Sequence, residues 1–273
     1  MNWIKKNRST IILVFVFFIG LSLLLYPSLS DYWNSFHQSK AIANYAETVA
    51  EIDTSEYQVM WQQAQEYNEK LLTKGQRFQL TDEEQEEYNS ILNVGGTGII
   101  GYIEIPDINV SLPIYHGVDD TILQIAIGHL TGTSFPIGGE GTHCAISGHR
   151  GLPSAKLFTN LDQMKEGDLF MMRVLDETYT YEVDQIRIVE PTDLSALKIE
   201  EGKDLCTLIT CTPYGVNSHR LLVRGHRVEN ILSNSIMVVA DASQLDSVLV
   251  APMYAVPILI ILLIGVLVRY RKR

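Results

Sequence analysis

Two apolar runs of the sequence end in side chains that can carry out acyl-transfer chemistry. Cys211 follows the run 205–210, and His149 comes shortly after the run 142–147. Strand ends beside loops are rigid yet accessible, which suits a thiol nucleophile and a proton-transferring imidazole. Arg220 begins the next apolar run, and its guanidinium can donate two hydrogen bonds to an oxyanion without changing its protonation. Together the three side chains predict catalysis by a cysteine nucleophile.

Each of these residues also has a plainer interpretation. A lone cysteine is usually a small buried hydrophobe. Arg224 shares a strand face with Arg220, so spacing leaves both arginines open as the third catalytic residue, while Arg227 faces the other side. A structural zinc site is disfavoured because the sequence has no C-x-x-C pair and no closely spaced histidine pair near its cysteines. We therefore expect no metal and no other cofactor.

Many short strands are expected to position these residues. Turn signals such as Gly138-Gly139, Gly167-Asp168 and Pro213-Tyr214-Gly215 separate apolar runs rich in β-formers. This pattern, with few helices, indicates a closed barrel or a sandwich. A short helix is expected at 121–127 with Gly128 as its C-cap. The expected strands are 99–105, 110–115, 142–147, 168–175, 178–189, 205–210 and 220–228.

Residues 31–92 have helical periodicity and precede the strands. Apolar positions recur at helical spacing from Ala41 to Ala50. Ser55 with Gln58 predicts a capping box that opens a helix to about Leu72. Thr81 with Glu84 predicts a second capping box and a shorter helix. This region is expected to form a helical segment in front of the strands.

Two uncharged segments, 10–26 and 247–268, are long enough to cross a bilayer as helices. Basic residues flank the outer end of each span, which predicts that both termini are cytoplasmic and that the part between is extracytoplasmic. The first segment also resembles a signal peptide, but no convincing cleavage site follows it, so an uncleaved anchor is favoured. The expected organisation is a basic flank 1–9, a span 10–26, a helical segment 27–97, a β-domain 98–228, a connector 229–246, a span 247–268 and a basic tail 269–273.

The charge of the chain restricts its partners. The net charge is −11, and all 32 acidic residues lie between the two spans with only 14 of the basic ones, a net of −18 for this part. Such a domain repels nucleic acid and favours a cationic partner or one that offers a lysine. The three cysteines, Cys144, Cys206 and Cys211, are an odd number and do not form a disulfide framework.

Four motifs resemble one family closely: TLITCTPYGVNSHRLLVRGHR, THCAISGHRGLP, GYIEIPDINVSLPIYHG and GHLTGTSFPIGG. They are similar to the sortases, and more narrowly to the class C, pilus-assembling sortases of Gram-positive cell surfaces. The resemblance implies an eight-stranded β-barrel from about Gly98 to Arg227, preceded by the helical segment and flanked by the two spans. It also implies the roles of three residues, with His149 as general acid and base, Cys211 as nucleophile and Arg220, in preference to Arg224, as oxyanion or substrate stabiliser.

The resemblance further implies a reaction and its partners. Cys211 would cleave an LPXTG-like sorting signal between Thr and Gly, and the lysine amine of another pilin would resolve the thioacyl intermediate. Alternatives remain at this point. The enzyme could anchor surface proteins to a cell-wall precursor, it could be a membrane-tethered cysteine protease, or the domain could be a non-catalytic receptor or scaffold with a structural cysteine.

Two features depart from the class C pattern or stand out within it. Class C members commonly carry a lid with an Asp-Pro-aromatic motif, and the stretch 80–84 (LTDEE) lacks that motif. Either Phe78 replaces it, or the site is open, or the site is covered differently. Cys144 and Cys206 each lie five residues before a catalytic residue, on strands that are neighbours in the family. We expect two buried thiols there, with a disulfide as the alternative.

Overall fold

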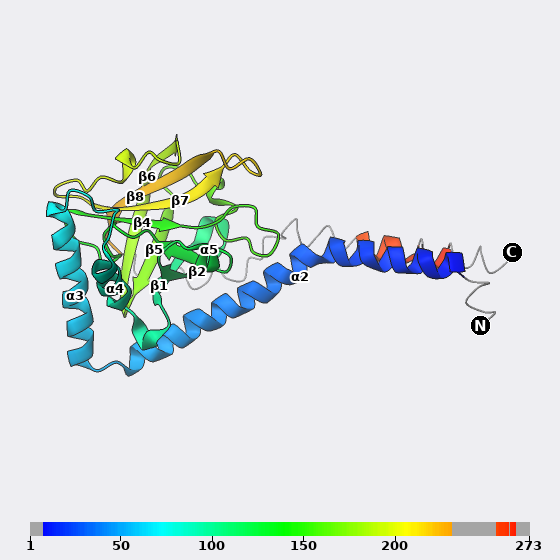
Figure 1. Cartoon of the computed structure of the whole chain (residues 1–273), viewed down its shortest axis with the longest axis horizontal. Helices are drawn as coiled ribbons and strands as arrows, with labels where there is room; N and C mark the ends of the chain where they lie inside the picture. Colours follow the sequence, from blue (N-terminus) through cyan, green and yellow to red (C-terminus); the bar gives the residue numbers. More distant parts are fainter. Residues whose placement is uncertain (1–7, 231–254, 262, 266–273) are drawn as a thin grey trace. The chain divides into compact units, whose positions relative to one another are not determined.

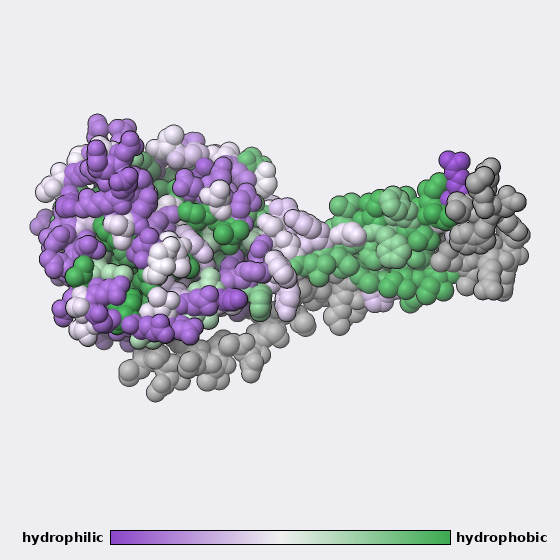
Figure 2. Space-filling view, turned by 60° about the horizontal axis from the view of Figure 1, so that its bottom comes forward, coloured by the Kyte–Doolittle hydropathy of each residue, from purple (hydrophilic) through white to green (hydrophobic). Residues whose placement is uncertain are grey.

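The computed structural model describes residues 8–230, 255–261 and 263–265 (Figure 1). The chain divides into two compact units, Met1–Trp33 with Val238–Arg273, and Asn34–Met237. Helix α2 (Arg8–Glu51) is long and apolar enough to cross a membrane, and it continues through Pro27. Figure 2 shows an apolar surface along its N-terminal part. The first expected span and the start of the helical segment are therefore one helix.

The second expected span is described only in part. Ala255–Gly265 is a short apolar helix. The rest of 247–268, most of the connector 229–246 and the tail 269–273 lie outside the described residues.

Two further helices precede the barrel. They are α3 (Thr54–Thr73) and α4 (Asp82–Ser90), followed by a 3-10 turn, η1 (Val94–Gly96). The capping box of Thr81 and Glu84 is confirmed. The predicted box of Ser55 and Gln58 is wrong, because the N-cap of α3 lies two residues earlier, at Asp53. The Asp53 carboxylate accepts hydrogen bonds from the backbone N–H groups of Ser55 and Glu56.

Eight strands form a closed barrel in the order β1-β2-β3-β4-β7-β8-β6-β5, which confirms the expected fold. Short helical turns η2 (Pro106–Ile108), α5 (Asp120–Leu123), η3 (Leu161–Gln163) and η4 (Ser195–Leu197) lie between strands. The strands are β1 (Ile99–Ile105), β2 (Val110–His116), β3 (Ile127–His129), β4 (Thr142–Ser147), β5 (Leu169–Val174), β6 (Glu177–Val189), β7 (Asp204–Thr212) and β8 (His219–Val228).

Two sequence predictions about these elements are wrong. The helix expected at 121–127 ends at Leu123, and Gly128 is not its cap but the centre of strand β3, which pairs with both β2 and β4. The strand expected at 205–210 extends to Thr212, so Cys211 lies within β7 and not beyond its end.

The helical segment packs on the barrel and completes its core. Tyr45 of α2 donates a hydrogen bond to the Ile100 carbonyl and accepts one from the Leu175 N–H. Asn68 of α3 makes two hydrogen bonds with the backbone of Phe135. The buried Tyr88 of α4 lies in the same apolar cluster as the barrel interior. The helices from Asn34 onward are thus part of the same compact unit as the barrel.

Candidate active site

The register between β4 and β7 sets the position of His149 relative to Cys211. The two strands run parallel, and Ser147 lies beside Ile209. His149 comes two residues after Ser147, and Cys211 comes two residues after Ile209. A step of two residues returns a side chain to the same face of the sheet. The imidazole and the thiol therefore belong to the same end of two adjacent strands.

Hydrogen bonds extend this ladder past the end of β4. The Gly148 N–H donates to the Ile209 carbonyl at 3.0 Å, and the Thr210 hydroxyl donates to the Gly148 carbonyl at 2.8 Å. The glycine is required, because a Cβ at position 148 would lie 2.7 Å from both Ile127 and the ring of Phe158. Hydrogen bonds and close packing therefore hold the backbone directly before His149 against β7.

Arg220 lies directly opposite Cys211 in the antiparallel ladder of β7 and β8. Its guanidinium donates to the carbonyls of Asn217, at 3.3 Å, and His219, at 3.1 Å, so the β7–β8 loop holds it. Arg224 lies opposite Thr207, four residues before Cys211 in β7, and forms ion pairs with Asp184 and Glu200. The geometry thus favours Arg220 over Arg224 as the arginine beside the thiol.

The face of β7 that carries Cys211 is the outside of the barrel. Cys206 and Leu208 point into the barrel core, whereas Ile209 belongs to a second apolar cluster on the other face. We call this cluster the outer-face patch; its members are Ala145, Val189, Leu197, Ile209 and Leu222. Ile209 and Leu222 are directly paired, two positions of the ladder before Cys211 and Arg220 and therefore on the same face. An apolar surface therefore leads up to the three candidate residues.

Comparisons with known proteins agree with this geometry. Residues 103–228 match the family model described as the sortase domain. The crystal structure of sortase C1 from Streptococcus agalactiae is 53% identical with a TM-score of 0.68, over 70% of this chain and 100% of that one. The chain belongs to the sortase family. Proteins of this family are cysteine transpeptidases.

Two more solved sortases are similar. Sortase C of Streptococcus pneumoniae, whose structure is described as giving insights into pilin substrate specificity, is 46% identical (TM-score 0.63, 70% of this chain, 97% of that one). Sortase C of Clostridium perfringens with the C-terminal cell wall sorting motif is 41% identical (TM-score 0.63, 70% and 100%). The chain spans 63%, 56% and 47% of the curated sortases from Bacillus subtilis, Staphylococcus aureus and S. agalactiae that it matches.

Phe78 packs on the outer-face patch of this sortase, together with Leu130 and Ala196. Its half-buried ring packs against the patch, and the guanidinium of Arg77 lies 4.8 Å from the ring centroid. Arg77 also donates a hydrogen bond to the Leu197 carbonyl, and burial lowers its pKa. The stretch 80–84, expected at the position of the class C lid motif, instead caps and begins α4. Phe78 thus lies on the outer-face patch, and its replacement of the class C lid motif stays a prediction.

Sequence reasoning missed Arg77 altogether. No periodicity marks 74–80, and an arginine between two helices reads as an ordinary solvated residue. The close approach of Gly132, where a Cβ would lie 2.2 Å from the Arg77 carbonyl oxygen, shows how tightly this segment lies on the barrel. Only the fold reveals that contact.

Cys144 and Cys206 are paired in the ladder of β4 and β7, as neighbouring strands require. Both are free thiols and both are buried in the barrel core. Burial raises the pKa of the Cys206 thiol well above its ordinary value, which keeps it protonated. Cys211 is the partly exposed member of the three. It alone has the access that a nucleophile requires.

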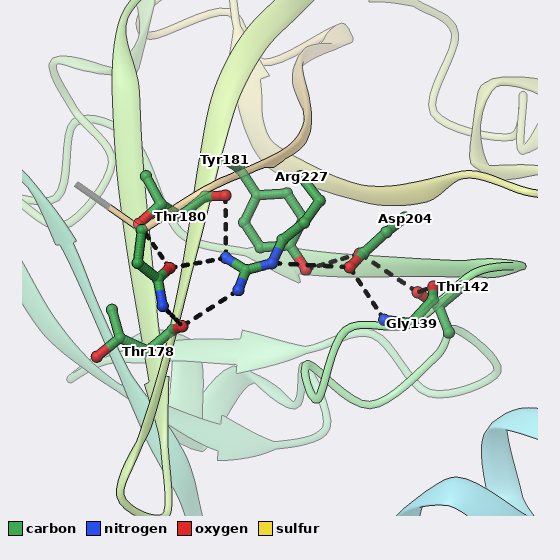
Figure 3. A network of polar contacts seen from close by, with 8 residues as sticks. Gly139, Thr142, Thr178, Thr180, Tyr181, Asp204 and Arg227 are labelled. Atoms are coloured by element: carbon green, nitrogen blue, oxygen red, sulfur yellow. Dashed lines mark hydrogen bonds and ion pairs between the residues drawn. The ribbon is translucent and has the colours of Figure 1, made fainter. Parts of the chain in front are cut away.

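A polar network at the opposite end of β7 anchors that strand (Figure 3). Asp204, the first residue of β7, accepts hydrogen bonds from the Tyr181 hydroxyl at 2.9 Å and the Gly139 N–H at 3.0 Å. Arg227 lies 4.0 Å from the same carboxylate, and its guanidinium donates to the carbonyls of Thr178 and Thr180. Each acid oxygen has a partner, so we assign the network to fixing β7 and not to chemistry.

Proposed function

We propose that this chain is a class C sortase whose catalytic residues are Cys211, His149 and Arg220. The observation that carries the proposal is the shared register of three adjacent strands, which brings a partly exposed thiol, an imidazole and a guanidinium to one end of one sheet face. A thiol nucleophile needs a proton-transfer partner and a donor for the oxyanion. The other histidines of β3 and β4 have partners of a structural kind. His129 contacts the Tyr88 hydroxyl, and His143 contacts Thr207.

The reaction follows in two steps. The Cys211 thiolate attacks the Thr–Gly carbonyl of a sorting signal, Arg220 donates hydrogen bonds to the oxyanion, and His149 gives a proton to the leaving glycine amine. The product of this step is a thioester between the threonine acyl group and Cys211. An incoming amine then gives up a proton to His149 and attacks the thioester. The C–S bond breaks, a new amide bond forms, and the Cys211 thiolate and protonated His149 are restored.

The substrate we propose is an LPXTG-like signal, and the acceptor is a lysine amine of another pilin subunit. Support comes from the class C character of the similar structures. One of them is described in terms of pilin substrate specificity and another contains a cell wall sorting motif. The acidic part of the chain, with a net charge of −18, favours an acceptor surface that offers lysines. Anchoring to a cell-wall precursor is the alternative, and it differs only in the acceptor amine.

We further propose that the protein is held in the plasma membrane with the barrel outside. Helix α2 supplies one span, and the apolar segment 247–268 supplies the other. Basic residues at both chain ends favour cytoplasmic termini. The catalytic unit would then act on substrates that reach the same membrane surface.

The segment containing Arg77 and Phe78 is proposed to act as a removable cover. A peptide whose carbonyl lies at Cys211 must lie along the face that carries Ile209 and Leu222, since these residues share that face. Phe78 occupies the same surface. The segment must therefore move before a substrate can bind along it.

Mass spectrometry of the full chain in detergent, with an LPXTG peptide and an amine acceptor, tests the function. We expect a cleaved peptide joined to the amine, absent in Cys211→Ala and in His149→Ala, and strongly reduced in Arg220→Gln. A pilin-derived lysine peptide and a cell-wall peptide, offered in competition, identify the acceptor. Hydrolysed product alone with both acceptors would point to a protease. An undiminished reaction in Cys211→Ala would refute the assignment of the nucleophile.

A further inference from the structure

Arg150 follows His149 directly, and its surroundings are unusual for a surface arginine. Its side chain is only 10% exposed. It forms an ion pair with Asp162 of η3, and its Cζ lies 5.8 Å from the ring centroid of Tyr214. Burying a guanidinium is costly unless ion pairs and hydrogen bonds compensate for its lost hydration.

The partners of Arg150 belong to both loops of the active site. Asp162 lies at the end of the loop that begins with His149, whereas Thr212 and Tyr214 follow Cys211. The Arg150 Nη1 approaches the Thr212 hydroxyl at 3.5 Å. Its Nε is buried and has no acceptor among the described residues. One guanidinium thus bridges the segment after the imidazole and the segment after the thiol.

The backbone around Arg150 is arranged for this contact. The Phe158 N–H donates to the His149 carbonyl, and the Gly151 N–H donates to the Thr159 hydroxyl, so the loop folds back on itself beside the arginine. Gly151 has a φ of 76°, and a Cβ there would lie 2.8 Å from the Tyr214 ring. Close packing of the two loops therefore depends on both residues of the Arg150-Gly151 pair.

We propose that Arg150 is a positioning residue that sets the separation of the His149 imidazole and the Cys211 thiol by clamping Asp162 to the loop after Cys211. The proposal rests on the catalytic roles proposed above. Arg150 touches neither reacting group and acts through the two loops. Lysine cannot replace it fully, because a single ammonium on a flexible stem lacks the planar fork that bridges two partners.

Two measurements on the full chain in detergent test the clamp in Arg150→Gln, Arg150→Lys and Asp162→Asn. The first is kcat and KM for the peptide. The second needs no peptide substrate and is the rate of Cys211 alkylation at pH 6 divided by the rate at pH 9. Alkylation is followed by mass spectrometry as the gain of one adduct, and Cys211→Ala serves as the blank. Arg173→Gln is the matched control. It also removes an arginine from an ion pair, but that pair joins Arg173 of β5 to Glu104 of β1 and not the two active-site loops.

For Arg150→Gln we expect kcat to fall about 10-fold to 100-fold with KM within about twofold, because a misplaced catalytic group costs rate and not binding. The alkylation ratio should fall as the imidazolium moves away from the thiolate. Arg150→Lys should be intermediate, Asp162→Asn should change both quantities in the same direction, and Arg173→Gln should match the wild type.

A wild-type kcat and alkylation ratio in Arg150→Gln would overturn the proposal, as would an equal loss in Arg173→Gln. If Arg150→Gln does not fold, the milder Arg150→Lys and Thr212→Val carry the same two readouts and decide the question. If the wild type joins no peptide to any amine, the proposed function fails. The alkylation ratio still tests the role of Arg150, since it depends on the position of the imidazole relative to the thiol and not on a peptide substrate.

Discussion

Replacing Phe78 by alanine should activate the enzyme. The half-buried ring is the apolar group that the covering segment places on the outer-face patch. Removing it leaves the Arg77 hydrogen bond to the Leu197 carbonyl in place, so the segment loses only part of its attachment. The substitution touches none of Cys211, His149 and Arg220.

The expected size follows from burial. Fully burying a phenylalanine side chain contributes about 1.5–3 kcal/mol, so the half-buried ring contributes about 1 kcal/mol to the closed arrangement. A loss of about 1 kcal/mol multiplies the open population about fivefold while the closed state predominates. Because substrate binds only the open state, kcat/KM should rise by about the same factor, and alkylation of Cys211 should accelerate in parallel.

The assay is initial-rate transpeptidation of a sorting-signal peptide by the full chain, alongside Cys211 alkylation. Trp61→Ala is the matched control, because Trp61 packs α3 on the barrel through Tyr179 at a ring separation of 6.4 Å and not on the patch. Unchanged or reduced kcat/KM in a folded Phe78→Ala protein would refute the reasoning. Equal activation by Trp61→Ala would show general loosening and refute the specific role of Phe78.

Three other substitutions give separate tests. Arg220→Lys should lower kcat about 100-fold to 1,000-fold with little change in KM, measured by steady-state kinetics. Gly148→Ala should cost about 1–3 kcal/mol of unfolding free energy through overpacking against Phe158, measured by denaturant titration. Burial lowers the pKa of His143 to about 4, so its unfolded form takes up a proton first as the pH falls. This contribution to stability is complete above pH 6.5 and lost towards pH 4, by about 3 kcal/mol in total, and His143→Gln should remove this pH dependence.

Some elements were predictable from local patterns and others were not. The strand at 142–147 is an apolar run bounded by glycines, and the structure has β4 at those residues. The three-residue strand β3 is too short to show any periodicity, so its residues were assigned to a helix end. Asp53 and Ser55 are both good capping residues, and only the contacts decide that Asp53 accepts the two free N–H groups of α3.

Sequence patterns name the candidate site residues, but they do not give the contacts that arrange them. Cys211, His149 and Arg220 stand out because each borders an apolar run. The sequence gives no sign of the role of Arg150, because an arginine in a loop is usually solvated. Its partners Asp162 and Thr212 are also distant in sequence. Bridging contacts between two loops leave no periodic signal in the sequence.

The run 205–210 explains why the facing of Cys211 could not be decided from sequence. A strand with one solvated face alternates apolar and polar residues, and a one-residue slip would turn every side chain to the other face. Here Cys206 and Leu208 lie in the barrel core while Leu205 and Ile209 are buried on the outer face, so the run is nearly continuous and carries no alternation. Such a run is stable in water only if something covers its second face. In this chain Phe78, Leu130 and Ala196 pack on that second face, so the apolar character of β7 matches the presence of a cover. Loss of Phe78 would expose part of the outer-face patch.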